Sequence, residues 1–153
     1  MRNFYLYILL FFLSVAAYSQ KQYTVTFETL PEKMAAERRP VLIKIYTDWC
    51  AICKIQDKQV AKDIELQKIL AEKYYYLECD AETKNDIVFN GKSYHHIASG
   101  ANNGYHEFAA LFAQGGNAYP LWAILSPEYE ITGIYNGLIK SKQLTEILKQ
   151  YQP

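Results

Sequence analysis

Cys50 and Cys53 stand three positions apart directly after an apolar stretch, and this arrangement constrains the fold of the chain more than any other feature. Residues 41–47 are mostly apolar and β-branched except at Lys44, which predicts a central strand covered on both faces. The residues that follow predict a helix, with the cysteines at its N-terminus. There, unpaired N–H groups and the positive end of the helix dipole favour the reactive thiolate. Strand, Cys-x-x-Cys and helix together predict a redox-active pair of thiols.

Two other interpretations of this pair are weaker. A structural disulfide between Cys50 and Cys53 would close a very small loop and contribute little chain-entropy stabilisation. A zinc site would need two more ligands, and the chain has no second Cys-x-x-Cys and no His-x-x-x-His. The available ligands would be Cys79, His95, His96 and His106. We therefore favour a redox pair without a metal.

The other cysteine and the histidines have less informative surroundings. Cys79 ends a predicted strand, where a small buried hydrophobe is a commoner role than a regulatory thiol. His95 and His96 lie in a turn-rich segment and are expected to be exposed to solvent. His106 is expected on the polar side of a short helix, from which it is a candidate to approach the cysteines.

The first 19 residues predict a secretory signal. Arg2 precedes an apolar run over residues 4–17, and small residues at Ala17 and Ser19 suit cleavage after Ser19. An uncut membrane anchor is the alternative, but the run is shorter than the roughly 20 residues that span a bilayer. We expect a secreted or periplasmic domain over residues 20–153, with no membrane span after cleavage. In that oxidising compartment Cys50 and Cys53 are the natural couple.

Composition limits the partners of the domain. The 153 residues suit one domain, and half of them are apolar. Lys and Arg number 16 against 16 Asp and Glu, so no basic footprint for a nucleic acid is visible.

Hydrophobic periodicity and turn residues predict an α/β fold. A hairpin is expected around Asn90-Gly91, pairing residues 87–89 with 92–97. Thr29, Asp63 and Ser141 are expected to cap helices. The predicted strands cover residues 23–27, 41–47, 74–79, 121–126 and 131–136, and the predicted helices cover 32–38, 51–60, 64–73, 105–114 and 142–151.

This order of elements, with Trp-Cys-x-x-Cys after the second strand, resembles the thioredoxin family. Three patches carry the resemblance: VLIKIYTDWCAICK at residues 41–54, YPLWAI at 119–124 and GLIKSKQL at 137–144. Within the family the chain looks closest to secreted thioredoxin-like proteins and to the C-terminal domain of the periplasmic electron-transfer protein DsbD. The resemblance implies a central mixed sheet flanked by helices, with an insert at about residues 81–116 before the cis-proline strand.

The resemblance also implies roles for individual residues. Cys50 would be the exposed attacking thiol, and Cys53 would resolve the mixed disulfide. Trp49 would form part of the surface beside the site. Pro120 would be cis, and the loop of Tyr119 and Pro120 would lie against the cysteines and offer backbone groups to a substrate chain.

Two departures from the family pattern concern proton transfer and the substrate face. Many family members carry a buried acid at the position of Lys44. A lysine there favours a nearby thiolate by its charge, or else extends its ammonium to the edge of the sheet. The insert at 81–116 places a feature of this chain near the expected substrate face.

The sequence therefore predicts a secreted thiol–disulfide oxidoreductase that needs no cofactor. Its partner would be a disulfide-containing protein, with electrons supplied by a membrane-embedded donor. Reduction is favoured over oxidation because the intervening residues Ala51 and Ile52 include no histidine. A thioredoxin-fold binding module and a metal-binding chaperone are the alternative functions.

Overall fold

The computed structural model describes residues 23–100, 103–113, 116 and 118–151. The predicted secretory signal at residues 1–19 lies outside these ranges. Among the described residues, no helix has both the length and the apolar character needed to cross a bilayer.

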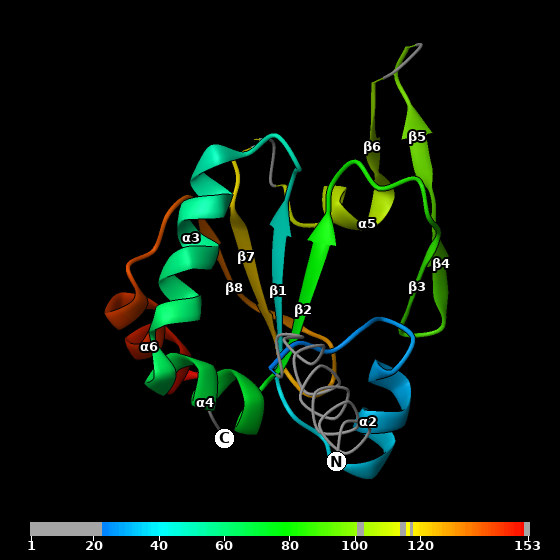
Figure 1. The fold of residues 1–153 in the computed structure, drawn as a ribbon. Coiled ribbons are helices and arrows are strands. Elements are labelled where there is room, and N and C mark those ends of the chain that lie inside the picture. The colour runs from blue at the N-terminus through cyan, green and yellow to red at the C-terminus, as the bar shows by residue number, and fades with distance from the viewer. Residues whose placement is uncertain (1–22, 101–102, 114–115, 117, 152–153) are drawn as a thin grey trace, which may run out of the picture.

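A four-stranded mixed sheet forms the centre of the molecule, in the order β2-β1-β7-β8 (Figure 1). Strand β1 runs parallel to β2 and antiparallel to β7, which is also antiparallel to β8. The strands are β1 (Val41–Tyr46), β2 (Tyr75–Asp80), β7 (Leu121–Leu125) and β8 (Ile131–Asn136). This arrangement confirms the predicted α/β thioredoxin-like fold and the central, doubly covered position of β1.

Helices cover both faces of this sheet. Figure 1 shows α3, α4 and α6 on one side and α2 and α5 on the other. Their bounds are α2 (Leu30–Ala36), α3 (Ala51–Lys62), α4 (Ile64–Glu72), α5 (Glu107–Ala110) and α6 (Ser141–Gln150). Side chains alternate along β1, so Leu42 joins the core under α3, α4 and α6 whereas Val41, Ile43 and Ile45 join the opposite core.

Most predicted element boundaries hold within two residues, but the expected first strand is absent. Around residues 23–27 there is a single bridge from Thr24 to Tyr76, with the Val25 N–H donating to the Tyr76 carbonyl at 2.7 Å. The chain then turns, because the Thr26 and Thr29 hydroxyls bond each other and each accepts the backbone N–H of the other residue. Helix α2 consequently begins at Leu30, two residues earlier than predicted.

The three predicted helix caps have different outcomes. Asp63 caps α4 as expected, since its Oδ1 accepts the Leu66 N–H at 3.0 Å. Thr29 occupies the cap position of α2, but its side chain accepts no hydrogen bond from that helix. The prediction for Ser141 is wrong: Ser141 is the first residue of α6, and Lys140 holds the cap position.

The insert contains two hairpins and a single turn of helix. The predicted hairpin is present, and both residues of its Asn90-Gly91 turn have positive φ, as a type I′ turn requires. Its second strand ends at Tyr94, so the predicted 92–97 strand is too long. The hairpin strands are β3 (Ile87–Phe89), β4 (Lys92–Tyr94), β5 (His96–Ala98) and β6 (Gly104–His106).

The second hairpin, β5–β6, replaces the start of the predicted 105–114 helix. Tyr105 pairs with Ile97, and the His106 N–H donates to the Ala81 carbonyl at 2.7 Å. These residues therefore hydrogen-bond to distant backbone, and α5 is reduced to Glu107–Ala110. Helical spacing of Phe108 and Phe112 nevertheless buries both rings in the core.

Gln56 links α3 to the loop that precedes α6 through two hydrogen bonds. Its fully buried side chain donates from Nε2 to the Ile139 carbonyl and accepts the Ile139 N–H at Oε1, both at 2.9 Å. These two hydrogen bonds attach the cysteine-bearing helix to that loop at Gln56.

Replacing Gln56 by leucine should destabilise the fold. The change leaves the buried N–H and carbonyl of Ile139 unpaired, at a cost of about 1–3 kcal/mol for each group. Urea denaturation measures the effect. Gln143→Leu, at an exposed position of α6, is the control and should change stability by less than about 0.5 kcal/mol. Equal losses in the two variants would contradict the assigned role of Gln56.

Candidate active site

The cysteine pair occupies the N-terminus of α3, as predicted. Cys50 is the cap residue, and its Sγ accepts the Cys53 N–H at 3.1 Å. The two Sγ atoms are joined in a disulfide, with the Cα atoms 5.3 Å apart. After reduction the same N–H is available to stabilise a Cys50 thiolate, which is how a helix N-terminus activates a thiol.

Cys50 is less accessible than the family resemblance implies. It is 5% exposed in this disulfide form, against 2% for Cys53. Two large hydrophobic residues beside it are exposed, Trp49 at 67% and Ile52 at 44%. They give the surface next to Cys50 an aromatic and an aliphatic side chain.

The structure brings the predicted substrate-facing residues together. The Tyr119–Pro120 peptide bond is cis, as expected. Because β7 runs antiparallel to β1, with Leu121 opposite Ile45, Pro120 lies at the sheet edge from which the chain enters α3. The Tyr119 ring meets the Trp49 ring edge-on, with centroids 6.3 Å apart. The Pro120 carbonyl accepts the Gly137 N–H at 2.7 Å, which leaves that group engaged within the fold.

Glu82 also belongs to this surface, although the sequence analysis did not identify it. Its carboxylate accepts the Trp49 indole N–H, with both oxygens 3.1 Å from Nε1. Glu82 lies two residues after the end of β2, so the parallel pairing of β2 with β1 was the only indication of its place.

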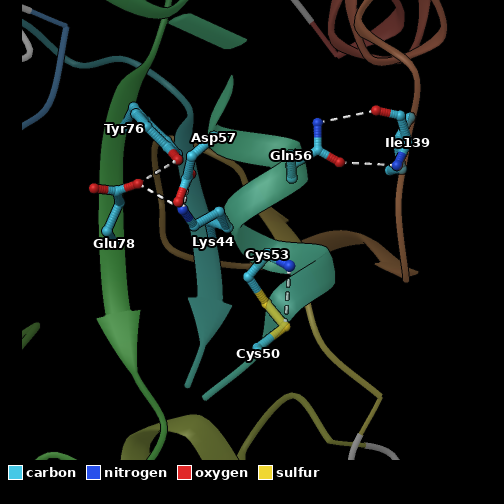
Figure 2. Close-up of polar contacts among 8 residues, drawn as sticks. All are labelled: Lys44, Cys50, Cys53, Gln56, Asp57, Tyr76, Glu78 and Ile139. Atoms are coloured by element: carbon cyan, nitrogen blue, oxygen red, sulfur yellow. Dashed lines mark hydrogen bonds and ion pairs between the residues drawn. A yellow bond between two sulfur atoms is a disulfide. The ribbon is translucent and has the colours of Figure 1, made fainter. Parts of the chain in front are cut away.

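Lys44 lies inside the protein, paired with two acids. Its side chain is 1% exposed, and its Nζ donates to Asp57 Oδ1 and, at 2.7 Å, to Glu78 Oε1. Figure 2 shows this cluster between β1, β2 and α3. The alternative in which the ammonium extends to the edge is therefore wrong, because the alternation of β1 directs Lys44 toward α3, where a carboxylate receives it.

Tyr76 completes the buried cluster. Its hydroxyl donates to Glu78 Oε1 at 3.0 Å, and burial raises its pKa well above the usual value, so the phenol stays protonated. One ammonium thus faces two carboxylates, and the cluster carries one net negative charge when all three groups are ionised. Asp57 and Cys53 are four residues apart on α3 and so share a helix face. The cluster therefore lies one helical turn from the second cysteine.

Sequence signals for the two acids existed but were weak. Glu78 stands opposite Lys44 in the parallel register of β1 and β2. Asp57 follows Cys53 by one helical turn. The signal for Glu78 depends on the register of β1 and β2, which the sequence alone leaves open because a strand can shift by one residue. The signal for Asp57 depends on which face of α3 packs on the sheet.

His106 is not available to the cysteines in the way that was expected. It is fully buried and caps α5, where its Nδ1 accepts the Phe108 N–H at 3.2 Å. Burial lowers its pKa, which keeps the imidazole neutral. The predicted position on a polar helix face is wrong because His106 belongs to strand β6, which packs against the sheet edge at Ala81.

The other two histidines belong to the insert. His95 pairs with Asp86 at 2.9 Å on the surface, and this hydrogen bond raises its pKa. His96 stands opposite His106 in the β5–β6 ladder. Within the ranges that the structure describes, no three His, Cys, Asp or Glu side chains are grouped to hold a metal ion.

Cys79 is a buried thiol in β2, 1% exposed. Burial raises its pKa to about 12. A thiol with so little thiolate and so little access reacts slowly.

Replacing Lys44 by methionine should destabilise the protein by about 3 kcal/mol. Breaking a buried ion pair costs about 3–5 kcal/mol, and partial exposure of Asp57 and Glu78 places this case at the lower end. Adding Glu78→Gln should restore part of the loss, because one uncompensated charge is removed. Urea denaturation at pH 7 measures both. Lys58→Met, at an exposed position of α3, is the control; a double variant no more stable than Lys44→Met would refute the pairing.

Labelling with a chromogenic aromatic disulfide should distinguish the cysteines. The native oxidised protein should not react at pH 8 within minutes, because Cys79 is its only free thiol and is buried. Unfolding in guanidinium should release one reactive thiol per chain, and none in Cys79→Ala. Rapid labelling of the native protein would show that Cys79 is accessible.

Comparison with known proteins agrees with the fold. A family model described as thioredoxin-like matches residues 23–127, whereas no curated protein is significantly similar in sequence. A mutant thioredoxin from Halobacterium salinarum NRC-1 is similar in structure, with a TM-score of 0.52, 14% identity, and coverage of 88% of this chain and 96% of that chain. The germline-specific thioredoxin Deadhead from Drosophila melanogaster has a TM-score of 0.54, 15% identity, and coverage of 83% and 95%. At these identities the likeness concerns the fold, and the family match over most of the chain shows that this protein belongs to the thioredoxin-like family.

Proposed function

We propose that this protein is an exported thiol–disulfide oxidoreductase that reduces disulfides in partner proteins. The observation that carries the proposal is the Cys50–Cys53 disulfide at the N-terminus of α3, beside a cis-proline loop in a thioredoxin-like fold. The pair can hold or release two electrons without a metal or an organic cofactor.

The reaction begins from the reduced dithiol. The Cys50 thiolate attacks one sulfur of a substrate disulfide, and the other substrate sulfur leaves as a thiolate. The Cys53 thiol then loses its proton, and its thiolate attacks Cys50 Sγ. The second substrate thiolate leaves, the substrate has gained two electrons, and the protein returns to the disulfide form seen in the structure.

The two partly buried acids beside Lys44 supply a place for the Cys53 proton. A charged lysine has no lone pair to accept it, but two carboxylates share the one ammonium of Lys44. Asp57 stands on the same face of α3 as Cys53, so its carboxylate is the better placed acceptor. Lys44 then acts indirectly, since it limits the negative charge that would otherwise oppose a nearby thiolate.

The direction and the cellular place of the reaction are separate parts of the proposal. Export is supported by the sequence of residues 1–19, and reduction by the absence of histidine between the cysteines. A reductant outside the cytoplasm needs a continuing supply of electrons, so we assign it a membrane-embedded dithiol donor. This role resembles that of the C-terminal domain of DsbD.

Insulin reduction with dithiothreitol as electron source tests the activity. Wild type should accelerate precipitation of the insulin B chain, Cys50→Ser should not, and Cys53→Ser should accumulate a mixed disulfide because it lacks the resolving thiol. Cys79→Ala is the matched control and should remain active. A wild type no faster than Cys50→Ser would leave a binding module as the better interpretation.

The reduction potential of the Cys50–Cys53 pair tests the direction of the reaction. A potential of roughly −270 mV would support reduction, and one near −120 mV would support oxidation.

A further inference from the structure

A small apolar cavity opens beside the cysteine site, and the insert builds most of it. Its volume is about 290 Å³. One wall is the sheet edge, with Ala81, Tyr119 and Leu121, and the other is Tyr105 of β6 with the alanines of α5 and the following turn. This volume is at the lower end of the roughly 300–1,000 Å³ of pockets that hold drug-sized ligands, so the space is large enough for an amino-acid side chain.

The cavity is continuous with the surface at which a partner disulfide would react. Tyr119 lines the cavity and contacts Trp49, the residue directly before Cys50. Ala81, also in the wall, is followed by Glu82, which holds the Trp49 indole. When a cysteine of a partner polypeptide reacts with Cys50, the residues next to that cysteine therefore lie near the cavity mouth.

The rim of this surface is acidic. Asp48 and Glu82 are exposed. Burial, and then the negative charges of Asp48 and Glu82, raise the pKa of the half-buried Asp80. Tyr105 adds an aromatic face that is 48% exposed. An apolar hollow with an acidic rim is complementary to an apolar side chain flanked by a basic one.

We infer that the insert forms a substrate subsite, in which the cavity takes an apolar side chain of the partner polypeptide near its reacting cysteine while Asp48 and Glu82 face a basic residue of that chain. This inference rests on the proposed function. It assigns a role in specificity to a segment that the catalytic cysteines do not need.

Peptides that carry one cysteine as a mixed disulfide with thionitrobenzoate test the subsite. Attack by reduced Cys50 releases the coloured thiolate and gives a second-order rate constant. Peptides with leucine beside the cysteine should react about tenfold faster than serine peptides, because burying a leucine-sized side chain is worth at least one order of magnitude. Peptides with lysine at the next position should react faster than peptides with glutamate there, and Asp48→Asn should reduce that preference.

Filling the cavity should remove the preference for leucine. Ala110→Trp, at an exposed position of the cavity wall, should slow the leucine peptide about tenfold and leave the serine peptide unchanged. Ala113→Leu provides a second, smaller filling. Ala71→Trp, at an exposed position of α4 outside the cavity, is the control and should keep the preference.

The outcomes separate the subsite from the activity. A wild type that reacts with leucine and serine peptides at equal rates would overturn the subsite and leave the oxidoreductase proposal standing. Equal slowing of both peptides by Ala110→Trp would also overturn it. If reduced wild type reacted with these peptides no faster than Cys50→Ser, both proposals would fail.

Discussion

The pairing of β1 with a strand on each side is the constraint on which the rest of the structure depends. Hydrogen bonds to β2 and β7 fix β1 at the centre of the sheet, and helices bury both of its faces. The chain therefore leaves β1 at one defined point of the sheet edge, where Cys50 caps α3. The cis-proline loop reaches the same edge because β7 is antiparallel to β1. Strand order thus assembles the candidate site.

Central burial also explains the charged cluster. A lysine in the middle of β1 cannot reach water, so its ammonium must be paired within the protein. Glu78 comes from the neighbouring strand and Asp57 from the helix that bears the cysteines. The same contacts that make Lys44 tolerable in the core hold the carboxylate of Asp57 one helical turn from Cys53. In the proposed reaction, the cluster that neutralises Lys44 would also receive the Cys53 proton.

The segments that sequence patterns predicted correctly have strong local signals. Asn90-Gly91 specifies a tight hairpin, and Asp63 caps a helix with regular apolar spacing. The errors lie where distant backbone competes with a local pattern. Residues 105 and 106 have helical spacing with Phe108, yet they pair as β6 because β5 and Ala81 offer hydrogen-bond partners. Residues 23–27 alternate like a strand but make a single bridge before the chain turns into α2.

By itself the sequence determined the cysteine spacing, the strand before it and the helix after it, because these depend on neighbouring residues and on periodicity. It also determined the cis-proline position through the family resemblance. Only the tertiary structure decided which acids meet Lys44, that Glu82 holds Trp49, and that the insert places a cavity next to Tyr119. These contacts join segments that are distant in the chain. Strand register and the packing of the insert set them, and no local pattern encodes either.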